Sequence, residues 1–307
     1  LDTLDGAVAP STHRQYRDVV PLYVRPHRGQ KRLRTLAPRD VTAMVQALDR
    51  DGRSANTCRL ARSVLRRALR WAEHEGMVAR NVAAVAQGVH LRAKEGRTMT
   101  PEQARTLLAT VQEDRLAAAF TVALALGLRR GELLGLSWTD VELDAAPPRL
   151  TVRRSLKRIG GQGLVLDDTK TARSMRTVHL PGPVVDALRA HRARQAAERL
   201  HAGELWEPAP LGADLVFRTP AGTAIDPGNF LHATYRATER AGLGRWSAHE
   251  LRHSAASLLL AQGVDLKVVS EVLGHASIRI TADVYGHLLE PAKAEAADAM
   301  TAALWGT

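Results

Sequence analysis

The chain has 307 residues and a formal net charge of +11 at pH 7, from 43 Lys and Arg against 32 Asp and Glu. This length is enough for two domains with separate cores. The charge favours a polyanionic partner, although an Arg- and Ala-rich chain is equally typical of a GC-rich genome. Cys58 is the only cysteine, which excludes an intrachain disulfide and fits a reducing compartment. No apolar run reaches the roughly 18 residues of a membrane-spanning helix.

Residues 1–88 are predicted to form a small helical domain. Helix-start signals stand at Ser11, Pro38 and Ser54. The third helix is dense in arginines, which a solvated helical face would also explain. Residues 1–90 hold 16 Lys and Arg against 8 Asp and Glu, so we expect this helix to face DNA. Its arginines are Arg59, Arg62, Arg66, Arg67 and Arg70.

Residues 89–98 have mixed charges and no hydrophobic period, which predicts an interdomain linker. Residues 99–307 are predicted to form a second domain. It opens with a helix whose capping box pairs Thr100 with Gln103. The almost wholly apolar residues 116–126 predict a buried helix.

Two consecutive arginines, Arg129 and Arg130, follow this apolar helix. Burying an unpaired charge is costly, so each of them needs a partner. A salt bridge to Glu132 would satisfy one of the two. The second arginine therefore indicates that one guanidinium of the pair faces a ligand anion.

Residues 149–152, 163–166 and 176–180 alternate apolar and polar side chains, which predicts a small antiparallel sheet. A polar turn within residues 168–174 carries Lys170. Solubility alone would explain a lysine in such a turn. The expected fold is mainly α with a small antiparallel β-sheet, an α+β class.

Three further helices are predicted in the second domain. One covers residues 183–200, another starts at Asp226, and the last covers residues 291–305. The apolar stripe of the last helix, with Met300 and Leu304, suits docking on a neighbouring subunit and packing within its own domain equally well. The residues expected to face inward from the first of these helices are Val184, Val185, Leu188 and Ala196.

Ser247 and Glu250 have the spacing of a capping box at a helix start. This places His249 in the first turn, with Arg252 three residues further along the same face. Free backbone N–H groups and the positive end of the helix dipole point the same way. The arrangement predicts a site for a phosphate.

The same residues, from His249 to His253, spell H-E-x-x-H, the zinc-protease motif. Zinc is disfavoured because Glu250 is used in the cap and because the Arg252 guanidinium would repel a metal ion. The chain also has neither the Gly-x-Ser-x-Gly elbow of a triad hydrolase nor a phosphate-binding loop for ATP. No metal and no cofactor is expected.

Four stretches of the second domain closely resemble the tyrosine recombinases, the phage-integrase family. In chain order they are LGLRRGELLGL (residues 126–136), HELRHSAA (249–256), LGH (273–275) and ITADVYGHL (280–288). Residues 1–88 resemble the helical core-binding domain of that family more loosely. The resemblance implies a two-domain DNA-binding enzyme with a C-terminal catalytic domain.

The resemblance also implies roles for individual residues. Arg129 and Arg252 match the two catalytic arginines that hold the non-bridging oxygens of the scissile phosphate. Lys170 matches the lysine that protonates the leaving 5′-oxygen, and His249 matches the acid/base histidine beside it. Tyr285 matches the nucleophile.

His275 matches the His or Trp position that supports the phosphate and the nucleophile. With these residues the expected activity is site-specific recombination of duplex DNA through a 3′-phosphotyrosine, which integrates or excises a mobile element. Paired arginines neutralise the charge that grows on the phosphate oxygens without a metal ion. The phosphotyrosine conserves the bond energy, so no ATP is needed.

The resemblance implies a homotetramer on two DNA sites, possible accessory directionality or DNA-bending factors, and a cytoplasmic, nucleoid-associated location. Two alternatives remain open. One is a type IB topoisomerase with the same chemistry, and the other is a DNA-binding protein without catalysis. The DNA target is beyond the sequence, because base readout depends on a few groove-facing side chains. The chain begins with Leu1 rather than Met, so a preceding arm-binding domain also stays open.

Overall fold

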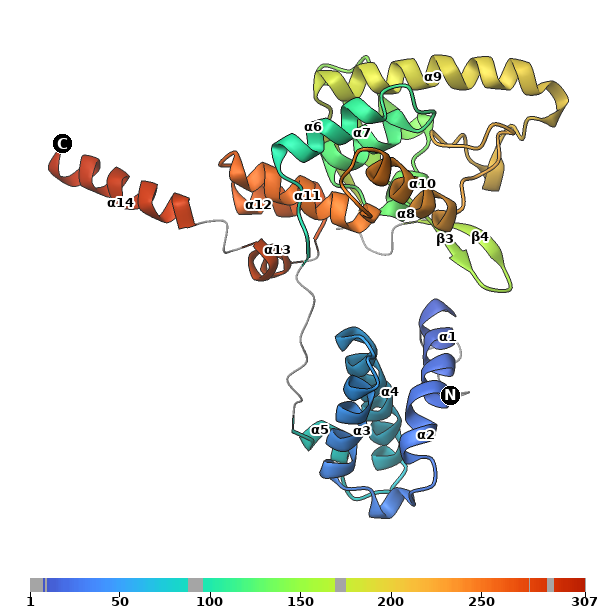
Figure 1. Ribbon diagram of the computed structural model, residues 1–307, viewed down its shortest axis with the longest axis vertical. Helices are drawn as coiled ribbons and strands as arrows, with labels where there is room; N and C mark the ends of the chain where they lie inside the picture. The colour runs from blue at the N-terminus through green and yellow to red at the C-terminus, as the bar shows by residue number, and fades with distance from the viewer. Residues whose placement is uncertain are drawn as a thin grey trace. The chain divides into compact units, whose positions relative to one another are not determined.

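The computed structural model describes residues 8, 10–87, 96–168, 175–275, 277–285 and 290–306, with only the backbone for residues 10, 11, 284 and 290–297. The chain divides into two compact units, residues 1–95 and residues 96–307 (Figure 1). Within the described residues, no helix is long and apolar enough to span a membrane.

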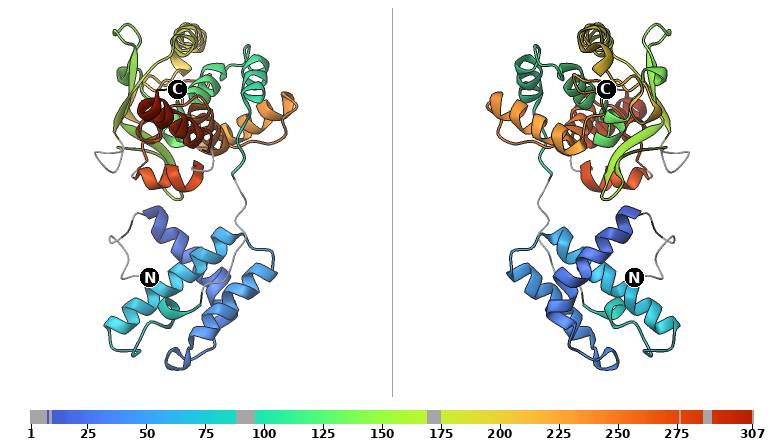
Figure 2. Two further views of the ribbon diagram at one scale, coloured as in Figure 1. Left: turned by 90° about the vertical axis from the view of Figure 1, so that its left-hand side faces the viewer. Right: turned by 90° about the vertical axis from the view of Figure 1, so that its right-hand side faces the viewer.

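The regular elements in the described part of the first unit are all helices. Figure 2 shows its helices from two sides. The Ser54 hydroxyl accepts a hydrogen bond from the Thr57 N–H and caps the longest of these helices, Ala55–His74. The elements are α1 (Pro10–Val19), the π-helical turn η2 (Val20–Val24), α2 (Arg25–Arg28), η3 (Leu33–Thr35), α3 (Pro38–Arg50), α4 (Ala55–His74) and α5 (Val82–Val85).

The core of this unit forms where α3 packs against α4. The apolar residues of α3 recur at helical spacing and are fully buried: Val41, Met44, Val45 and Leu48. The predicted starts of α3 and α4 are confirmed. Ser11 is not a cap, because α1 already begins at Pro10 and continues through η2 into α2. Pro21 lacks a backbone N–H, which fits the wider π-helical turn at that point.

The second unit is mainly helical, with short strands at one side (Figure 1). Its elements are α6 (Pro101–Thr110), α7 (Ala117–Leu126), α8 (Arg130–Leu134), η4 (Trp138–Asp140), β1 (Val141–Glu142), β2 (Arg149–Val152), β3 (Arg154–Ile159), β4 (Gly163–Asp168), β5 (Arg176–His179), α9 (Gly182–Ala202), η5 (Gly203–Leu205), η6 (Pro210–Gly212), α10 (Pro227–Arg240), α11 (Ala248–Ala261), α12 (Leu266–Leu273), α13 (Ile278–Tyr285) and α14 (Glu290–Trp305).

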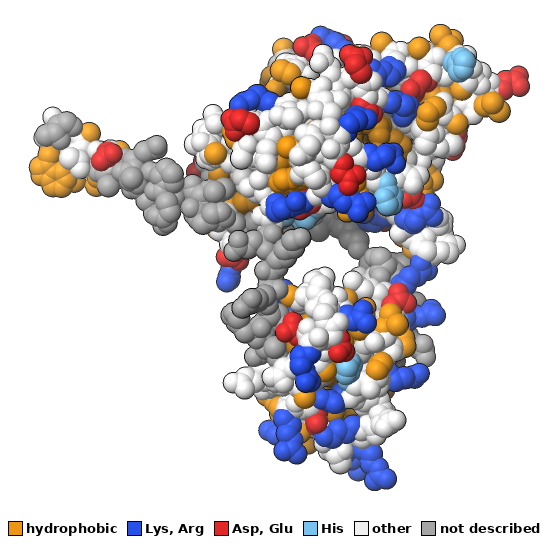
Figure 3. Space-filling model, in the orientation of Figure 1, with side chains coloured by type: hydrophobic (Ala, Val, Ile, Leu, Met, Phe, Trp, Pro, Cys, Tyr) orange, Lys and Arg blue, Asp and Glu red, His pale blue; other side chains and the backbone are white. Residues whose placement is uncertain are grey.

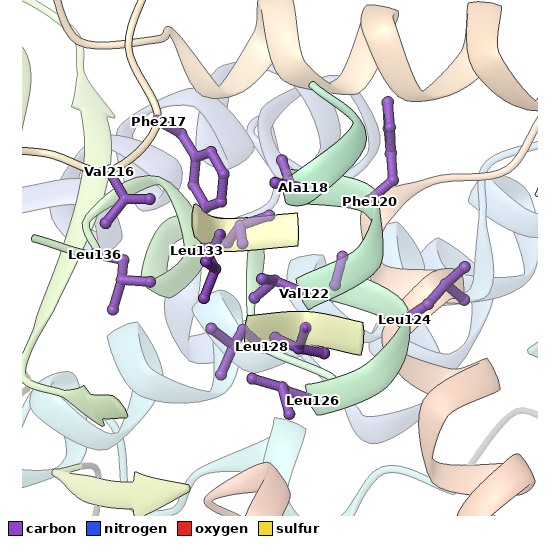
Figure 4. Close-up of a cluster of buried hydrophobic side chains, with 14 of the residues drawn as sticks. Ala118, Phe120, Val122, Leu124, Leu126, Leu128, Leu133, Leu136, Val216 and Phe217 are labelled. Carbon is purple, nitrogen blue, oxygen red and sulfur yellow. The ribbon is translucent and has the colours of Figure 1, made fainter. Parts of the chain in front are cut away.

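The core of the second unit is built around α7, the buried helix that the apolar run predicts. Figure 4 shows Leu128 and Leu133 lying beside Val122 of this helix. On another side of α7, Phe120 stacks on Phe230 of α10, with ring centroids 5.8 Å apart. Because α7 is surrounded by apolar side chains, the loop that leaves it at Gly127 starts from a fixed position.

The strands form two antiparallel sheets rather than the one sheet that was predicted. One sheet has the order β1-β2-β5, and Leu150 lies opposite Val178 in it. The other is the β3–β4 hairpin, in which Leu156 lies opposite Leu166. The prediction missed β1, which has only two residues, and β3, whose sequence RSLKRI is dominated by charge.

The inward face of α9 also differs from the prediction. Val184, Val185 and Leu188 are buried as expected, but Ala196 is exposed. His191 and Gln195 take the inward positions and bond the main-chain oxygen of Val216. A polar side chain is tolerated in a core when its hydrogen-bonding groups find such partners. The Trp138 indole N–H also donates to Gln195, at 2.7 Å.

We predict that His191 makes the second unit less stable in mild acid. The ring is 4% exposed, and burial lowers its pKa below the ordinary 6.5. As the pH falls through 6.5, the unfolded chain therefore takes up this proton before the folded one does. The contribution of His191 to the free energy of unfolding therefore has its full value above pH 6.5 and declines below that pH.

Urea unfolding at about pH 7.5 and about pH 5.5 tests this prediction. His191→Gln, which keeps a donor for Val216, should lose less stability between the two pH values than the unmodified protein does. His201→Gln, at an exposed position of the same helix, should show the unmodified pH dependence. Equal pH dependence in all three proteins would contradict the prediction.

Candidate active site

The N-terminus of α11 forms one wall of the candidate site. Ser247 accepts from the Glu250 N–H at 3.3 Å, and the Glu250 carboxylate accepts from the Ser247 N–H at 2.7 Å. The predicted capping box is therefore confirmed. It fixes the first turn of the helix, so His249 and Arg252 leave the same wall together.

Arg252 is a buried cation in this wall, with 3% exposure. Its Nη1 donates to the Gly127 carbonyl at 2.7 Å. Its Nη2 is buried and has no hydrogen-bond partner among the described residues. Burial, followed by the positive charge of Arg129, lowers the pKa of Arg252 to about 9. An unused donor on a buried guanidinium is a site for an anion.

Glu132, on α8, is a buried carboxylate that two arginines share. Arg129 donates to its Oε1 at 2.7 Å, and Arg176 donates to its Oε2 at 2.9 Å. Burial opposes ionisation of Glu132, but the hydrogen bond and charge of Arg176, together with the side-chain and backbone hydrogen bonds of Arg129, outweigh it. The pKa of Glu132 is therefore held below its usual value.

The same two arginines bind the C-terminal end of α12. Arg129 donates to the Gly274 carbonyl at 2.8 Å, and Arg176 donates to the Val272 carbonyl at 2.7 Å. Helix carbonyls at this end lack intrahelical partners, and cations there are favoured. Arg129, predicted at the site, and Arg176, which was not predicted, therefore join α8 and β5 to the segment that precedes His275.

Gly127 and Gly274 are required where these segments meet. Both have positive φ, 60° and 66°. A Cβ on Gly127 would lie 2.5 Å from Leu273, and one on Gly274 would lie 2.6 Å from the Arg176 guanidinium. Only glycine combines this backbone conformation with so close an approach. The L-G-L-R and L-G-H stretches thus have a packing reason for their glycines.

His275 follows α12 and faces the same positive charges. Its Nδ1 lies 2.7 Å from the hydroxyl of Thr281, which is fully buried on α13. Burial, followed by the charges of Arg252 and Arg129, lowers the pKa of His275 to about 4. The ring is therefore neutral at pH 7. Thr281 holds its orientation.

Tyr285, at the end of α13, is 3% exposed and packs into a small apolar cluster of α11 and α12. Its hydroxyl is hydrogen-bonded to His253 Nδ1. Burial raises the pKa of Tyr285 to about 12, although the Arg252 charge acts in the opposite direction. The phenol is therefore protonated at neutral pH and needs a base to become a nucleophile.

The two histidines of the H-E-x-x-H spelling pack against each other in this structure. Their rings meet edge to face, with centroids 4.5 Å apart. The Glu250 carboxylate is bound to Ser247 and to Arg97. In the part of the chain that is described, no three His, Cys, Asp or Glu side chains group as metal ligands.

The structure brings together the described members of the predicted site, which come from four segments of the second unit. Lys170 lies outside the described residues. The sequence missed three further side chains at the site. Glu132, which bonds Arg129, had been weighed only as a salt-bridge partner. Arg176, which bonds Glu132, and His253, which bonds Tyr285, were assigned no role. Local spacing could not reveal their bonds, because Arg176 and Glu132 are 44 residues apart. The described members are Arg129, His249, Arg252, His275 and Tyr285.

The arginines of α4 belong to the first unit. On the face shown in Figure 3, Lys and Arg side chains are spread widely over that unit. Arg59, Arg66 and Arg70 are exposed. Two of these arginines have partners within the unit. Arg62 donates to the Ala86 carbonyl at 2.7 Å, and the Arg67 guanidinium lies over the ring of Tyr16.

Comparison with known protein families matches both units. Residues 97–291 match the model of the phage integrase family, and residues 3–76 match the phage integrase N-terminal SAM-like domain. The chain therefore belongs to the phage integrase family, whose members include the tyrosine recombinases. It is a site-specific DNA recombinase.

Two curated relatives support this assignment. A tyrosine recombinase XerC-like protein of Caldanaerobacter subterraneus subsp. tengcongensis is 32% identical over 271 residues, covering 82% of this chain and 68% of that protein. An integrase of Streptomyces ambofaciens is 33% identical over 286 residues, covering 88% of this chain and 69% of that protein. Both identities extend over most of this chain.

Solved structures show the same fold at lower identity. The Tn1549 transposon integrase in complex with transposon right-end DNA superposes with a TM-score of 0.80 at 18% identity, covering 92% of both chains. A lambda integrase tetramer bound to a Holliday junction superposes with a TM-score of 0.60 at 19% identity, covering 90% of this chain and 72% of that one.

We predict that Glu132→Gln lowers the free energy of unfolding by about 3 kcal/mol, because it leaves buried guanidinium charge without its carboxylate. The matched control is Glu142→Gln. Glu142 pairs with Arg149 at the surface, where both side chains are more than 40% exposed. That change should cost less than about 1 kcal/mol. Urea unfolding measures both, and equal losses would contradict the prediction.

Proposed function

We propose that this recombinase cleaves and rejoins duplex DNA through a 3′-phosphotyrosine at Tyr285, and thereby integrates or excises a mobile element. The observation that carries the proposal is that the Tyr285 phenol and the unpartnered Nη2 of the buried Arg252 belong to one cluster of side chains. A nucleophile and an anion-binding donor brought together in this way suit attack on a phosphodiester.

The phosphate would be bound by Arg252 and Arg129. A buried donor without a partner costs roughly 1–3 kcal/mol, and a phosphate oxygen would remove that cost. The α11 N-terminus adds its dipole and free N–H groups on the same side. Charge that grows on the oxygens in the transition state would meet donors that are already in place.

Protonation of the leaving 5′-oxygen needs an acid. His249 and Lys170 are the proposed candidates. The pKa of His249 is lowered by burial and by the charges of Arg252 and Arg129, so its neutral form prevails at pH 7. A neutral histidine donates a proton less readily than a lysine ammonium group does. This favours Lys170 as the proton donor.

The assembly is proposed to be a homotetramer on two attachment sites in the cytoplasm, at the nucleoid. Support comes from the lambda integrase tetramer bound to a Holliday junction, which shares the fold. Met300, Leu304 and Trp305 of α14 are exposed, which suits docking of this helix on a neighbouring subunit. The arginines of α4 are proposed to contact the DNA backbone, and accessory directionality factors would act through the flanking DNA.

A type IB topoisomerase would use the same chemistry without sequence selection, so the target distinguishes the two. We predict that incubation with a pool of nicked duplexes of randomised sequence gives an SDS-resistant protein–DNA adduct. The nick releases a short strand and traps the adduct, because no 5′-OH remains nearby to reseal it. Sequencing the trapped DNA should reveal one shared site.

Tyr285→Phe should abolish the adduct, because the phenol oxygen forms the bond to phosphorus. Tyr23→Phe is the matched control, since Tyr23 lies in the first unit and keeps its ring under Arg53. An adduct that survives Tyr285→Phe, or its absence with the unmodified protein, would refute the proposed chemistry. Trapped DNA without a shared sequence would favour the topoisomerase.

We also predict that Arg252→Lys slows cleavage by roughly 10²–10³-fold, the usual cost of losing one preorganised donor. A lysine cannot donate to the Gly127 carbonyl and to a phosphate with one planar fork. DNA affinity should fall less than about tenfold, since many phosphate contacts share it. Arg189→Lys, at an exposed ion pair with Asp144, should change neither quantity. Single-turnover cleavage and filter binding measure them.

A further inference from the structure

We propose that His253 is the general base that takes the phenol proton from Tyr285 as the tyrosine attacks the phosphate. This inference rests on the proposed cleavage through Tyr285. It adds a catalytic residue that the sequence motifs do not assign. The observation behind it is the hydrogen bond between the Tyr285 hydroxyl and His253 Nδ1.

The elements that carry the two side chains hold this contact in place. His253 is in the middle of α11, whose first turn is fixed by the capping box. Tyr285 ends α13, and its ring packs into the apolar cluster that includes Ala256 and Leu260 of α11. The base and the nucleophile are therefore both anchored on α11, within hydrogen-bonding reach before any DNA is bound.

The direction of the hydrogen bond follows from the protonation states. Burial, followed by the positive charges around it, lowers the pKa of His253 below 6.5, so the ring is neutral at pH 7. Burial keeps the phenol protonated as well. The hydroxyl of Tyr285 therefore donates and Nδ1 accepts, which puts the ring proton on Nε2.

Several charged or titratable groups surround the His253 ring. Arg252 and His249 lower its pKa, and Glu250 raises it. These three belong to α11 itself. From the other elements, His253 meets Tyr285 on α13 and interacts electrostatically with His275 after α12. The net field is positive, so the ring stays unprotonated and ready to accept.

The other two histidines are less suited to this task. His275 Nδ1 is engaged by the Thr281 hydroxyl at 2.7 Å. His249 packs against the His253 ring, with ring centroids 4.5 Å apart, and it is not the histidine that bonds the phenol. Among the described residues, His253 is the side chain hydrogen-bonded to the Tyr285 oxygen.

The Tyr285 O–H bond breaks and its proton passes to His253 Nδ1, while the phenol oxygen forms a bond to phosphorus. The bond from phosphorus to the 5′-oxygen breaks, and that oxygen takes a separate proton from the acid, Lys170 or His249. His253 becomes an imidazolium. On religation it returns its proton to the departing phenol oxygen, which restores the starting state.

The experiment uses the full chain and compares His253→Asn with His253→Phe. The asparagine amide can accept a hydrogen bond from about the position of Nδ1, but it cannot take up a proton. Single-turnover cleavage of the DNA recovered with the trapped adduct is measured from pH 5 to pH 9. We expect both variants to be at least about 10²-fold slower, the usual contribution of a general base.

In the unmodified protein the rate should decline toward acidic pH as His253 becomes protonated. His253→Asn should lose that acidic limb. His201→Asn, at an exposed histidine, should keep the unmodified rate and profile. If His253→Asn cleaves at the unmodified rate while His253→Phe is slow, the ring only positions Tyr285, and the proposal is overturned.

A second substrate separates a base from an acid. With sulfur in place of the 5′-oxygen, the leaving group departs as a thiolate and needs little protonation, because thiols are far more acidic than alcohols. This substrate should rescue Lys170→Ala and leave His253→Asn slow. Rescue of His253→Asn would make the residue an acid and overturn the proposal.

The outcomes also separate this inference from the proposed function. If the unmodified protein forms no adduct that depends on Tyr285, the proposed cleavage chemistry itself fails. If the adduct forms and His253→Asn cleaves as fast as the unmodified protein, only the role of His253 is lost.

Discussion

The burial of the Arg252 charge is the constraint on which the rest of the site depends. A guanidinium with 3% exposure loses most of its hydration, which costs several kcal/mol unless partners replace the water. The Gly127 carbonyl replaces part of it, and the nearby Glu132 carboxylate supplies opposite charge. Glu132 in turn needs Arg129 and Arg176 to remain ionised in the core. Glu132 and its two arginines thus join α8, β5 and the end of α12 beside this buried cation.

The positive charge assembled in this way sets the protonation states of the neighbouring side chains. It adds to burial in lowering the pKa values of the histidines, and the effect is largest for His275, whose pKa falls to about 4. The phenol of Tyr285 is affected more by burial than by the charge, so its pKa rises. The resting site therefore combines fixed arginine cations with neutral acid–base groups, a state that is prepared for an anionic substrate.

The features that could be predicted from the sequence are those decided within a few residues. The caps at Ser54, Thr100 and Ser247 require only a side chain and the next turn of backbone, and the structure has all three. The burial of the His191 side chain could not be predicted, because its hydrogen-bond partner is a carbonyl 25 residues away. The Tyr285–His253 bond spans 32 residues and depends on how α11 and α13 pack. Such pairs are decided by tertiary packing rather than by local spacing.

Substrate binding would itself change the pKa of His253, the proposed base. A phosphodiester brings one negative charge into the field of Arg252 and Arg129, and a nearby negative charge favours the protonated form of an imidazole. The pKa of His253, which the resting site holds below 6.5, would therefore rise as the phosphate binds. The same charge disfavours a free phenolate at Tyr285. Proton transfer would then accompany the attack instead of preceding it, so the phenol stays unreactive until a phosphate is bound beside it.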